Sequence, residues 1–559
     1  MICALAALLL SACSSTPLPP WPAKAPDPAR RSVTTVPPPP GDARPGVVVV
    51  QKPSAPTLPM AQPVVRPAVQ AGTLQDLPYG PAVAARFPDP ATHYFTPGLA
   101  EQRRTFSTNA EIGRWLYQLA ERPGAAAIHG KWLQLGLSQR GEPIHALVLT
   151  QARDADPGTL SEGRRPTVVL VGQQHGDEPA GSEALLVIAQ ELSQGLLAPL
   201  LERINVIVVP RANPDGADAG TRTTDNGTDL DQDHLLLTTP EAQALARLIN
   251  NYRPALVLDA REFAVAGPFL EKFGGLRRND AHLLYSTTGN QHEFMTKAAR
   301  EWFHQPMQQS LRSLGLSTDW SHSTSSRPED LRVTMGSTHP DTGLNVQGLK
   351  NIVSVQIESR GAGMGRAHIQ RRVHTQITAI TTALRQTAER ASSLEQVRSF
   401  VVRDTIALAC RDKVVVQAGP TPEQHELTLL HPETGADLAV RVDWDSALTL
   451  RVLQQRPRPC GYWLSADAGK AVERLQLLGL QVLRVAEPGA LLSDSYQPIA
   501  AQAGSSATQT PQPLQVSLLR SAIDVPAGSY FVPLNQPLAN LAVAALEPDT
   551  GHSYFSHHV

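Results

Sequence analysis

The chain has 559 residues, of which 42% are hydrophobic and 18% are charged, and its formal net charge is −2. This length and composition favour a globular protein with two or three domains. The near-neutral charge argues against a nucleic-acid-binding protein, so we expect no nucleic-acid partner.

The N-terminus resembles a bacterial export signal. Residues 1–13 are apolar but too short to span a membrane, which is typical of a secretory signal peptide. Their last four residues, Leu-Ser-Ala-Cys, resemble a lipobox that would make Cys13 the lipid-anchored first residue. No Lys or Arg precedes Cys13, so a plain secretory signal is the alternative. Ser14 resembles the sorting pattern for the outer membrane, and we predict a lipid-anchored protein of the cell envelope that faces the periplasm.

Residues 14–92 are dense in proline, alanine and valine, with four consecutive prolines at 37–40. Such a composition predicts an extended tether without a hydrophobic core. The tether would give the rest of the chain reach from the membrane.

Residues 93–397 alternate between expected strands and helices. Thr108 and Glu111 form a capping-box pattern that predicts a helix to about Leu119. Strands are expected at 144–150, 167–171, 205–210, 255–259 and 352–357, and a further helix at about 181–194. This alternation predicts an α/β fold with a mixed, doubly wound sheet and helices on both faces.

The pattern changes near residue 398. Short β-like runs at 414–417, 426–430 and 438–442 precede a helix at 468–478. We therefore predict that residues 398–559 form a smaller, mostly β accessory domain. Cys410 and Cys460 form an even pair in an oxidising compartment, so a disulfide and two buried thiols both remain open.

The first candidate site follows the strand at 167–171. This apolar run breaks at Gly172 into a loop that carries His175 and Glu178. An open α/β sheet places its ligand crevice at the carboxyl ends of such strands. Imidazole and carboxylate groups suit zinc, so both residues are candidate metal ligands, although solvated loop residues give the same pattern.

Further polar residues follow the later strands. The turn Asn-Pro-Asp-Gly at 213–216 precedes Arg222, which is placed to hold a substrate carbonyl or oxyanion. Glu358 follows the strand at 352–357, where a carboxylate can act as a general base toward a metal-bound water. A surface arginine and an ordinary ion pair are the alternative interpretations.

Taken together, these segments resemble the zinc carboxypeptidase family of the carboxypeptidase A type, over about residues 108–390. In chain order they are L-G-x-S-x-x-G at 135–141, HGDE at 175–178, NPDG at 213–216, Arg222, D-L-x-x-D at 229–233, D-x-x-E-F at 259–263 and I-E-S-R-G at 357–361. Each motif alone is weak, but their common order is specific.

The resemblance implies residue roles as well as a mixed, doubly wound α/β fold. His175 and Glu178 match the first two zinc ligands, Arg222 the arginine that polarises the scissile carbonyl, and Glu358 the general base. One zinc ion and a peptide or acyl-amino-acid substrate are implied. The family's closing tyrosine has no clear counterpart, although Tyr285 is available.

Two positions depart from the family. Its third zinc ligand, a histidine, is replaced by Arg261, which has no lone pair to donate. Its Asn-Arg pair, which grips the substrate's terminal carboxylate, is replaced by Asp231 and Gln232. A carboxylate there would repel that terminus by roughly 1–4 kcal/mol at about 4 Å.

Three functions are therefore open. In the first, His234, His282 or Glu262 completes the zinc site, and the protein is a metallopeptidase with altered recognition of the terminus. In the second, the protein is a metal-free pseudopeptidase used for binding, in which the guanidinium of Arg261 lies among Glu178, Glu358 and Asp259. In the third, it is a metal-dependent N-acyl amino acid deacylase of the desuccinylase type.

Overall fold

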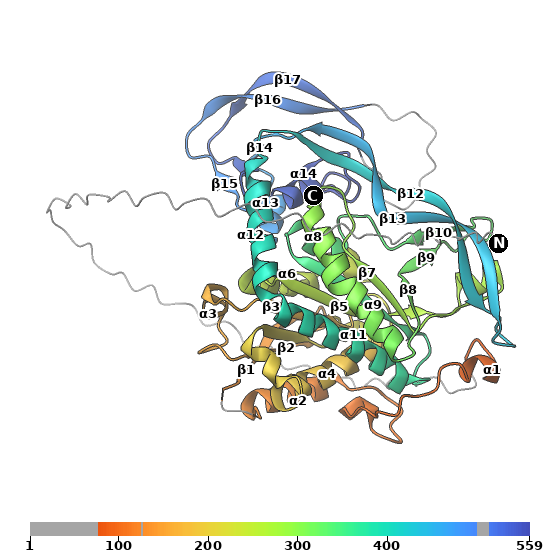
Figure 1. Ribbon diagram of the computed structural model, residues 1–559. Helices are drawn as coiled ribbons and strands as arrows, with labels where there is room; N and C mark the ends of the chain where they lie inside the picture. Colours follow the sequence, from red (N-terminus) through yellow and green to blue (C-terminus); the bar gives the residue numbers. More distant parts are fainter. Residues whose placement is uncertain (1–76, 125–126, 500–513) are drawn as a thin grey trace, which may run out of the picture. The chain divides into compact units, whose positions relative to one another are not determined.

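The computed structural model describes residues 77–124, 127–499 and 514–559, all within one compact unit that spans Arg66–Val559 (Figure 1). The predicted signal peptide, Cys13 and most of the tether lie outside the described residues. No helix in the described ranges is long and apolar enough to cross a membrane.

An eight-stranded mixed sheet forms the centre of this unit. Its strand order is β1-β2-β4-β3-β5-β11-β7-β8, and the neighbours β4, β3, β5 and β11 are parallel. The strands are β1 (His129–Leu137), β2 (Pro143–Thr150), β3 (Thr167–Gly172), β4 (Asn205–Val209), β5 (Leu256–Ala264), β7 (Ala281–Tyr285), β8 (Thr318–Trp320) and β11 (Val353–Ala362). The predicted mixed sheet is confirmed.

Helices cover both faces of the sheet, as predicted. On one face lie α2 (Asn109–Glu121), α4 (Pro179–Gln194) and α11 (Ile369–Glu389), which contact one another or the strands beneath them. The other face carries α6 (Pro240–Tyr252) and α10 (Gly343–Leu349). The sheet and α6 share one buried cluster, in which Val169 of β3, Ile207 of β4 and Val257 of β5 pack with Leu248 of α6.

The start of α2 contains the capping box of Thr108 and Glu111 that the sequence predicted. The Thr108 hydroxyl accepts from the Glu111 amide at 3.3 Å, and Glu111 accepts from the Thr108 amide at 2.8 Å. These reciprocal bonds satisfy amide groups that the first helical turn leaves unpaired. Arg103 also donates to both carboxylate oxygens of Glu111, each at 2.7 Å.

The C-terminal segment continues the same compact unit. The long antiparallel pair β12 (Lys413–Leu430) and β13 (Asp437–Pro457) binds β6 (Leu276–Arg277) and β10 (Arg332–Met335) along its edges. The fully buried α14 (Ala539–Leu546) packs in the cluster that covers the α6 face.

The boundary predicted at residue 398 therefore does not separate two compact units. It falls inside α12 (Ala391–Ala407), and strand pairing crosses it. The short runs that the sequence suggested are parts of two long strands. Apolar residues of β12 and α14 complete the core of the main sheet, which sequence periodicity alone does not reveal.

The predicted tether also ends earlier than residue 92. Val83 and Phe87 are buried and pack with Leu276 and Leu430. This packing anchors the short helix α1 (Pro81–Ala84) to the unit. Cys410 and Cys460 are joined in a disulfide, which decides between the two alternatives left by the sequence.

The remaining elements border these layers. They are α3 (Pro157–Glu162), α5 (Pro214–Ala219), α7 (Pro268–Phe273), α8 (Glu293–Ala298), α9 (Gln305–Ser313), α13 (Gly469–Leu477), β9 (His322–Thr324), β14 (Gly461–Leu464), β15 (Leu483–Arg484), β16 (Gly489–Pro498), β17 (Val516–Val525) and β18 (Tyr530–Pro533).

Candidate functional site

The sequence motifs meet at the carboxyl ends of β3, β5 and β11. In the parallel pair, Arg261 is in register with Glu358, and Asp259 with Gln356. Residues in register on neighbouring strands project to the same side, so these four side chains share a face. Arg261 and Glu358 lie within their strands rather than beyond the ends, because the pairing of β5 with β11 continues past them.

Close backbone contact joins the first two motif loops. A side chain at Gly176 would collide with the backbone of Gly216, so the HGDE and NPDG loops touch only with glycine there. Asn213 Nδ2 donates to the Gln174 carbonyl at 3.1 Å. Asp215 accepts from the Ser138 hydroxyl at 2.7 Å, which attaches the motif at 135–141 to the same cluster.

His175 is fully buried between two carboxylates. Its Nδ1 lies 2.7 Å from Glu178 Oε1, and its Nε2 lies 2.9 Å from Asp229 Oδ1. Burial and Arg261 oppose protonation, but the two carboxylates raise the pKa of His175 to about 9. At neutral pH the ring is therefore an imidazolium that donates from both nitrogens.

Arg261 lies beside this imidazolium. Its Nη2 is 2.9 Å from Nδ1 and 3.1 Å from Nε2 of His175, so it is nearly equidistant from the two ring nitrogens. Its Nη1 lies 3.0 Å from Asp231 Oδ2 and donates to Gln356 at 3.1 Å.

Carboxylates surround this pair of cations. Arg261 Nε lies 3.9 Å from oxygens of both Glu178 and Asp259. Although burial opposes its charge, the acidic neighbours raise the pKa of Arg261 well above its usual value. Burial in turn raises the pKa of Asp259 to about 7. The guanidinium thus compensates the buried acidic cluster.

Glu358, the candidate base, is next to this cluster. It accepts a hydrogen bond from Gln356 Nε2 at 2.9 Å, and its other oxygen lies 3.9 Å from His282 Nδ1. Burial raises the pKa of Glu358, which favours proton uptake by the carboxylate. The geometry keeps Glu358 beside Arg261, as the sequence suggested.

Arg222 and Gln232 lie at the more exposed side. Arg222 is half exposed and pairs with Asp229 Oδ2 at 3.1 Å and Glu178 Oε1 at 3.6 Å. Gln232 is exposed and lies 3.4 Å from Asp229 Oδ2. Asp231 instead turns to Arg261, so the two residues of the expected carboxylate-gripping pair have different partners.

In the described part of the chain, none of the three proposed replacement ligands forms a group with His175 and Glu178 in which the ligand atoms all lie within 4.8 Å of one another. His234 Nε2 bonds Gln174 Oε1 at 2.7 Å, and the His282 ring stacks on Phe263 at 3.9 Å between centroids.

The third of them, Glu262, points to the opposite face of the sheet. It accepts from Arg372 Nε at 2.7 Å and Nη2 at 2.9 Å, and from the Ala180 amide at 3.0 Å. Tyr285 is buried against Trp320 and His304, which argues against its closing on a ligand.

Sequence reasoning assigned no role to Asp229, Gln174 or Gln356. Asp229 fixes His175, Gln356 binds Arg261, and Gln174 Nε2 donates to Asp259 Oδ2 at 2.7 Å. The D-L-x-x-D motif was a signal for Asp229. For the two glutamines only their places beside motif residues hinted at a role.

The sequence profile described as zinc carboxypeptidase matches residues 112–325. Residues 112–325 belong to the zinc carboxypeptidase family. Carboxypeptidase 2 of Trichophyton tonsurans is 26% identical over 436 residues, covering 75% of this chain and 78% of that protein. Carboxypeptidase D of Mus musculus is 35% identical over 109 residues, covering 17% of this chain and 8% of that protein.

Solved carboxypeptidases are similar to this zinc carboxypeptidase-type domain. A metallo-carboxypeptidase from Pseudomonas aeruginosa is 18% identical with a TM-score of 0.37, covering 51% of this chain and 69% of that one. Carboxypeptidase A from Helicoverpa armigera is 16% identical with a TM-score of 0.36, covering 52% and 76%.

Zinc carboxypeptidases are expected to hold a zinc ion, but in this chain the residues at the family's zinc-ligand positions do not fit that ion. Structural and catalytic zinc sites use three or four lone-pair donors from the protein, and of the family's three ligand positions only His175 and Glu178 carry such donors here. Both nitrogens of His175 already face carboxylates, and the guanidinium of Arg261 takes the third position. The donor set therefore suits a cationic side chain better than a metal ion.

Proposed function

We propose that the zinc carboxypeptidase-type domain binds a peptide or acyl-amino-acid ligand with Arg261 in place of the family's zinc. The observation that carries this proposal is the position of the Arg261 guanidinium beside His175, where it pairs with Asp231 at 3.0 Å and lies 3.9 Å from both Glu178 and Asp259. The domain would then act as a binding module, without metal-assisted hydrolysis at this position.

Charge balance supports the exchange. A zinc ion contributes two positive charges, and the guanidinium of Arg261 with the imidazolium of His175 contributes the same number. Breaking a buried charge pair typically costs about 3–5 kcal/mol, so such a cluster needs its cations to remain folded. Arg261 supplies a positive charge to this cluster from a side chain, which cannot dissociate as a metal ion can.

The ligand class follows from the altered pair at 231 and 232. Asp231 is committed to Arg261 and Gln232 carries no charge, so a terminal carboxylate finds no guanidinium at these positions. An internal peptide segment presents neutral carbonyl groups instead, whereas an N-acyl amino acid would still carry one carboxylate. The half-exposed Arg222 is placed to donate to such a carbonyl.

Zinc-assisted hydrolysis of peptide or amide bonds is the second candidate. The family match over residues 112–325 favours it, together with the presence of Glu358 and Arg222 beside the site. In this alternative, Glu358 would act as the base and Arg222 would hold the oxyanion. The deacylase alternative shares these roles and differs in preferring N-acyl amino acids to peptides.

Restoring the missing ligand tests the proposal. Zinc content would be measured in the full-length protein, in Arg261→His and in the matched control Arg261→Gln, each with and without His175→Ala. We expect Arg261→His alone to gain a zinc ion that His175→Ala removes. A zinc ion that the unmodified protein holds and His175→Ala removes would contradict the proposal.

Ligand binding provides an independent readout. Calorimetry with peptides and N-acyl amino acids should detect binding that a chelator leaves unchanged and that Arg222→Gln weakens. Hydrolysis of the same compounds that a chelator abolishes would instead establish the second candidate. A preference for N-acyl amino acids among the hydrolysed compounds would establish the deacylase.

We also propose that the protein is anchored through lipidated Cys13 at the outer membrane of a bacterial cell, facing the periplasm. The lipobox-like sequence supports this location, and the disulfide between Cys410 and Cys460 suits an oxidising compartment. Membrane fractionation of the natural protein and of Cys13→Ser tests it. Release of the variant from the membrane is expected, and equal membrane retention would contradict the anchor.

A further inference from the structure

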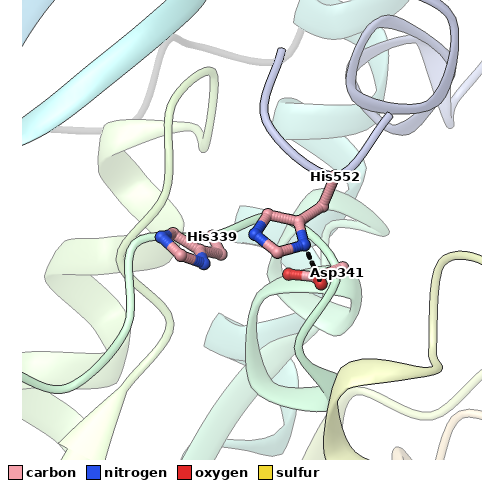
Figure 2. Close-up of side chains that lie close together, drawn as sticks. All are labelled: His339, Asp341 and His552. Carbon is pink, nitrogen blue, oxygen red and sulfur yellow. Dashed lines mark ion pairs between the residues drawn. The ribbon is translucent and has the colours of Figure 1, made fainter. Parts of the chain in front are cut away.

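A second cluster of metal-binding residue types lies away from the carboxypeptidase motifs. His339 and Asp341 come from the loop before α10, and His552 comes from the segment after α14 (Figure 2). One ligand atom of each lies within 4.8 Å of the others. Within the described ranges, this is the one group of three or more His, Cys, Asp or Glu residues with such spacing.

Asp341 has a buried carboxylate oxygen that lacks a hydrogen-bond partner among the described residues. Its side chain is buried, with a relative exposure of 3%. Oδ2 lies 2.9 Å from His552 Nδ1, but the buried Oδ1 has no hydrogen-bond partner among the described residues. A buried carboxylate oxygen without a partner costs about 1–3 kcal/mol or more, and a bound cation would remove that cost.

The two imidazoles border the same point. The rings of His339 and His552 have centroids 4.6 Å apart and an interplanar angle of 32°. Figure 2 shows these rings side by side, with the Asp341 carboxylate beneath His552. Two imidazoles and a carboxylate are a donor set that zinc uses, with bonds of about 2.0–2.2 Å.

The backbone around the ligands is well supported. Asn345 Nδ2 donates to the carbonyls of Ser337 and His339 at 2.9 and 2.8 Å, which holds the loop before α10. His552 has a φ of +63°, a left-handed conformation that is uncommon for non-glycine residues. Tyr554 donates to the Leu235 carbonyl at 3.2 Å and fixes the chain after His552.

We propose that His339, Asp341 and His552 bind one divalent transition-metal ion of the zinc class. Ligand atoms that now lie within 4.8 Å of one another would adjust to separations of about 3.4 Å, the edge of a tetrahedron with bonds near 2.1 Å. The exposed side of His339 leaves the fourth position to water. The ion joins the C-terminal segment to the loop before α10.

This loop also borders the carboxypeptidase-type site. A Cβ at Gly343, two residues after Asp341, would lie 2.9 Å from His234 Nε2 and 3.3 Å from Asp231 Oδ1. The bound ion therefore lies on a segment next to that site. Its role is to stabilise the position of the loop, and it needs no contact with the ligand bound at Arg261.

Zinc titration of the full-length, chelator-treated protein tests the proposal. We expect one zinc ion per chain by calorimetry and elemental analysis, with at least about tenfold weaker binding in His339→Ala and in His552→Ala. Zinc should also raise the melting temperature of the unmodified protein and not that of these variants. His129→Ala, which changes an exposed histidine on β1, is the matched control and should bind normally.

Three results would overturn the proposal. They are the absence of saturable zinc binding, equal affinity in His339→Ala and the unmodified protein, and loss of the ion only in His175→Ala. The last result would place zinc at the family's position and would contradict the proposed function as well. Because His339 is exposed, His339→Ala is expected to fold, and circular dichroism verifies this.

Discussion

Nη2 of Arg261 lies 2.9 Å from Nδ1 of His175. Arg261 therefore lies beside this histidine and is in register with Glu358 on the neighbouring strand. In the family to which residues 112–325 belong, zinc supplies the positive charge at this place. Under the proposed function, the guanidinium of Arg261 supplies this charge instead.

Removing the guanidinium should destabilise the fold. Arg261→Met leaves Asp231 without its partner at 3.0 Å and leaves Glu178 and Asp259 uncompensated. We expect the free energy of unfolding to fall by about 3–5 kcal/mol, the usual cost of breaking a buried charge pair. Urea denaturation measures it, and the matched variant Arg222→Met, at a half-exposed arginine, should lose under about 1 kcal/mol. Equal losses would show that burial of the acidic cluster does not depend on Arg261.

Cutting the chain at the boundary suggested by its sequence should prevent folding. A fragment that ends at residue 397 lacks α14, whose residues are all buried, and β12, whose Val414 and Val416 join the same core. Apolar residues of the main sheet's α6 face would then be exposed to water. We expect aggregation or loss of cooperative unfolding, measured by scanning calorimetry. A fragment that unfolds cooperatively at the temperature of the full chain would show that residues 398–559 are independent.

The pair of Arg103 and Glu111 should contribute an acid-sensitive part of the stability. Hydrogen bonds that the Glu111 carboxylate accepts from Arg103 and Thr108 lower the pKa of Glu111 from 4.5 to about 2. The carboxylate's contribution is therefore fully present above pH 4.5 and is lost as the pH falls toward 2. We expect Glu111→Gln to be less stable by about 1–2 kcal/mol at pH 7, and the difference to shrink toward pH 2. Denaturation curves at several pH values measure this, and a constant difference would contradict it.

The buried Lys350 should make stability depend on pH in a higher range, between about pH 7 and 10.5. Burial lowers the pKa of its ammonium group from 10.5 to about 7, and its Nζ lies 3.0 Å from Asn250 Oδ1. Between pH 7 and 10.5 the Lys350 side chain is protonated in the unfolded chain but largely neutral in the folded chain. The amount by which its burial lowers the free energy of unfolding therefore decreases as the pH rises. In Lys350→Met, the free energy of unfolding should rise less over that range than in the unmodified protein. Parallel curves for the two proteins would show that Lys350 titrates normally.

Local sequence signals predicted the fold where neighbouring residues decide the structure. Thr108 and Glu111 form the capping box that the pattern indicated, and the apolar run at 167–171 is the buried strand β3. A helix cap and a buried strand depend on hydrogen bonds and side-chain spacing within a few residues. The order of the motifs likewise indicated which strand ends would meet.

Tertiary packing decided the features that residues distant in the sequence make together. The sequence identified Arg261 as a departure, but its contacts with His175, Asp231 and Gln356 depend on the register of β5 and β11 and on the loop after β3. Packing also joined the C-terminal helix α14 to the main core and brought His552 to Asp341. Hydrophobic burial is non-directional, so periodicity indicates that a face must be covered without indicating which segment covers it.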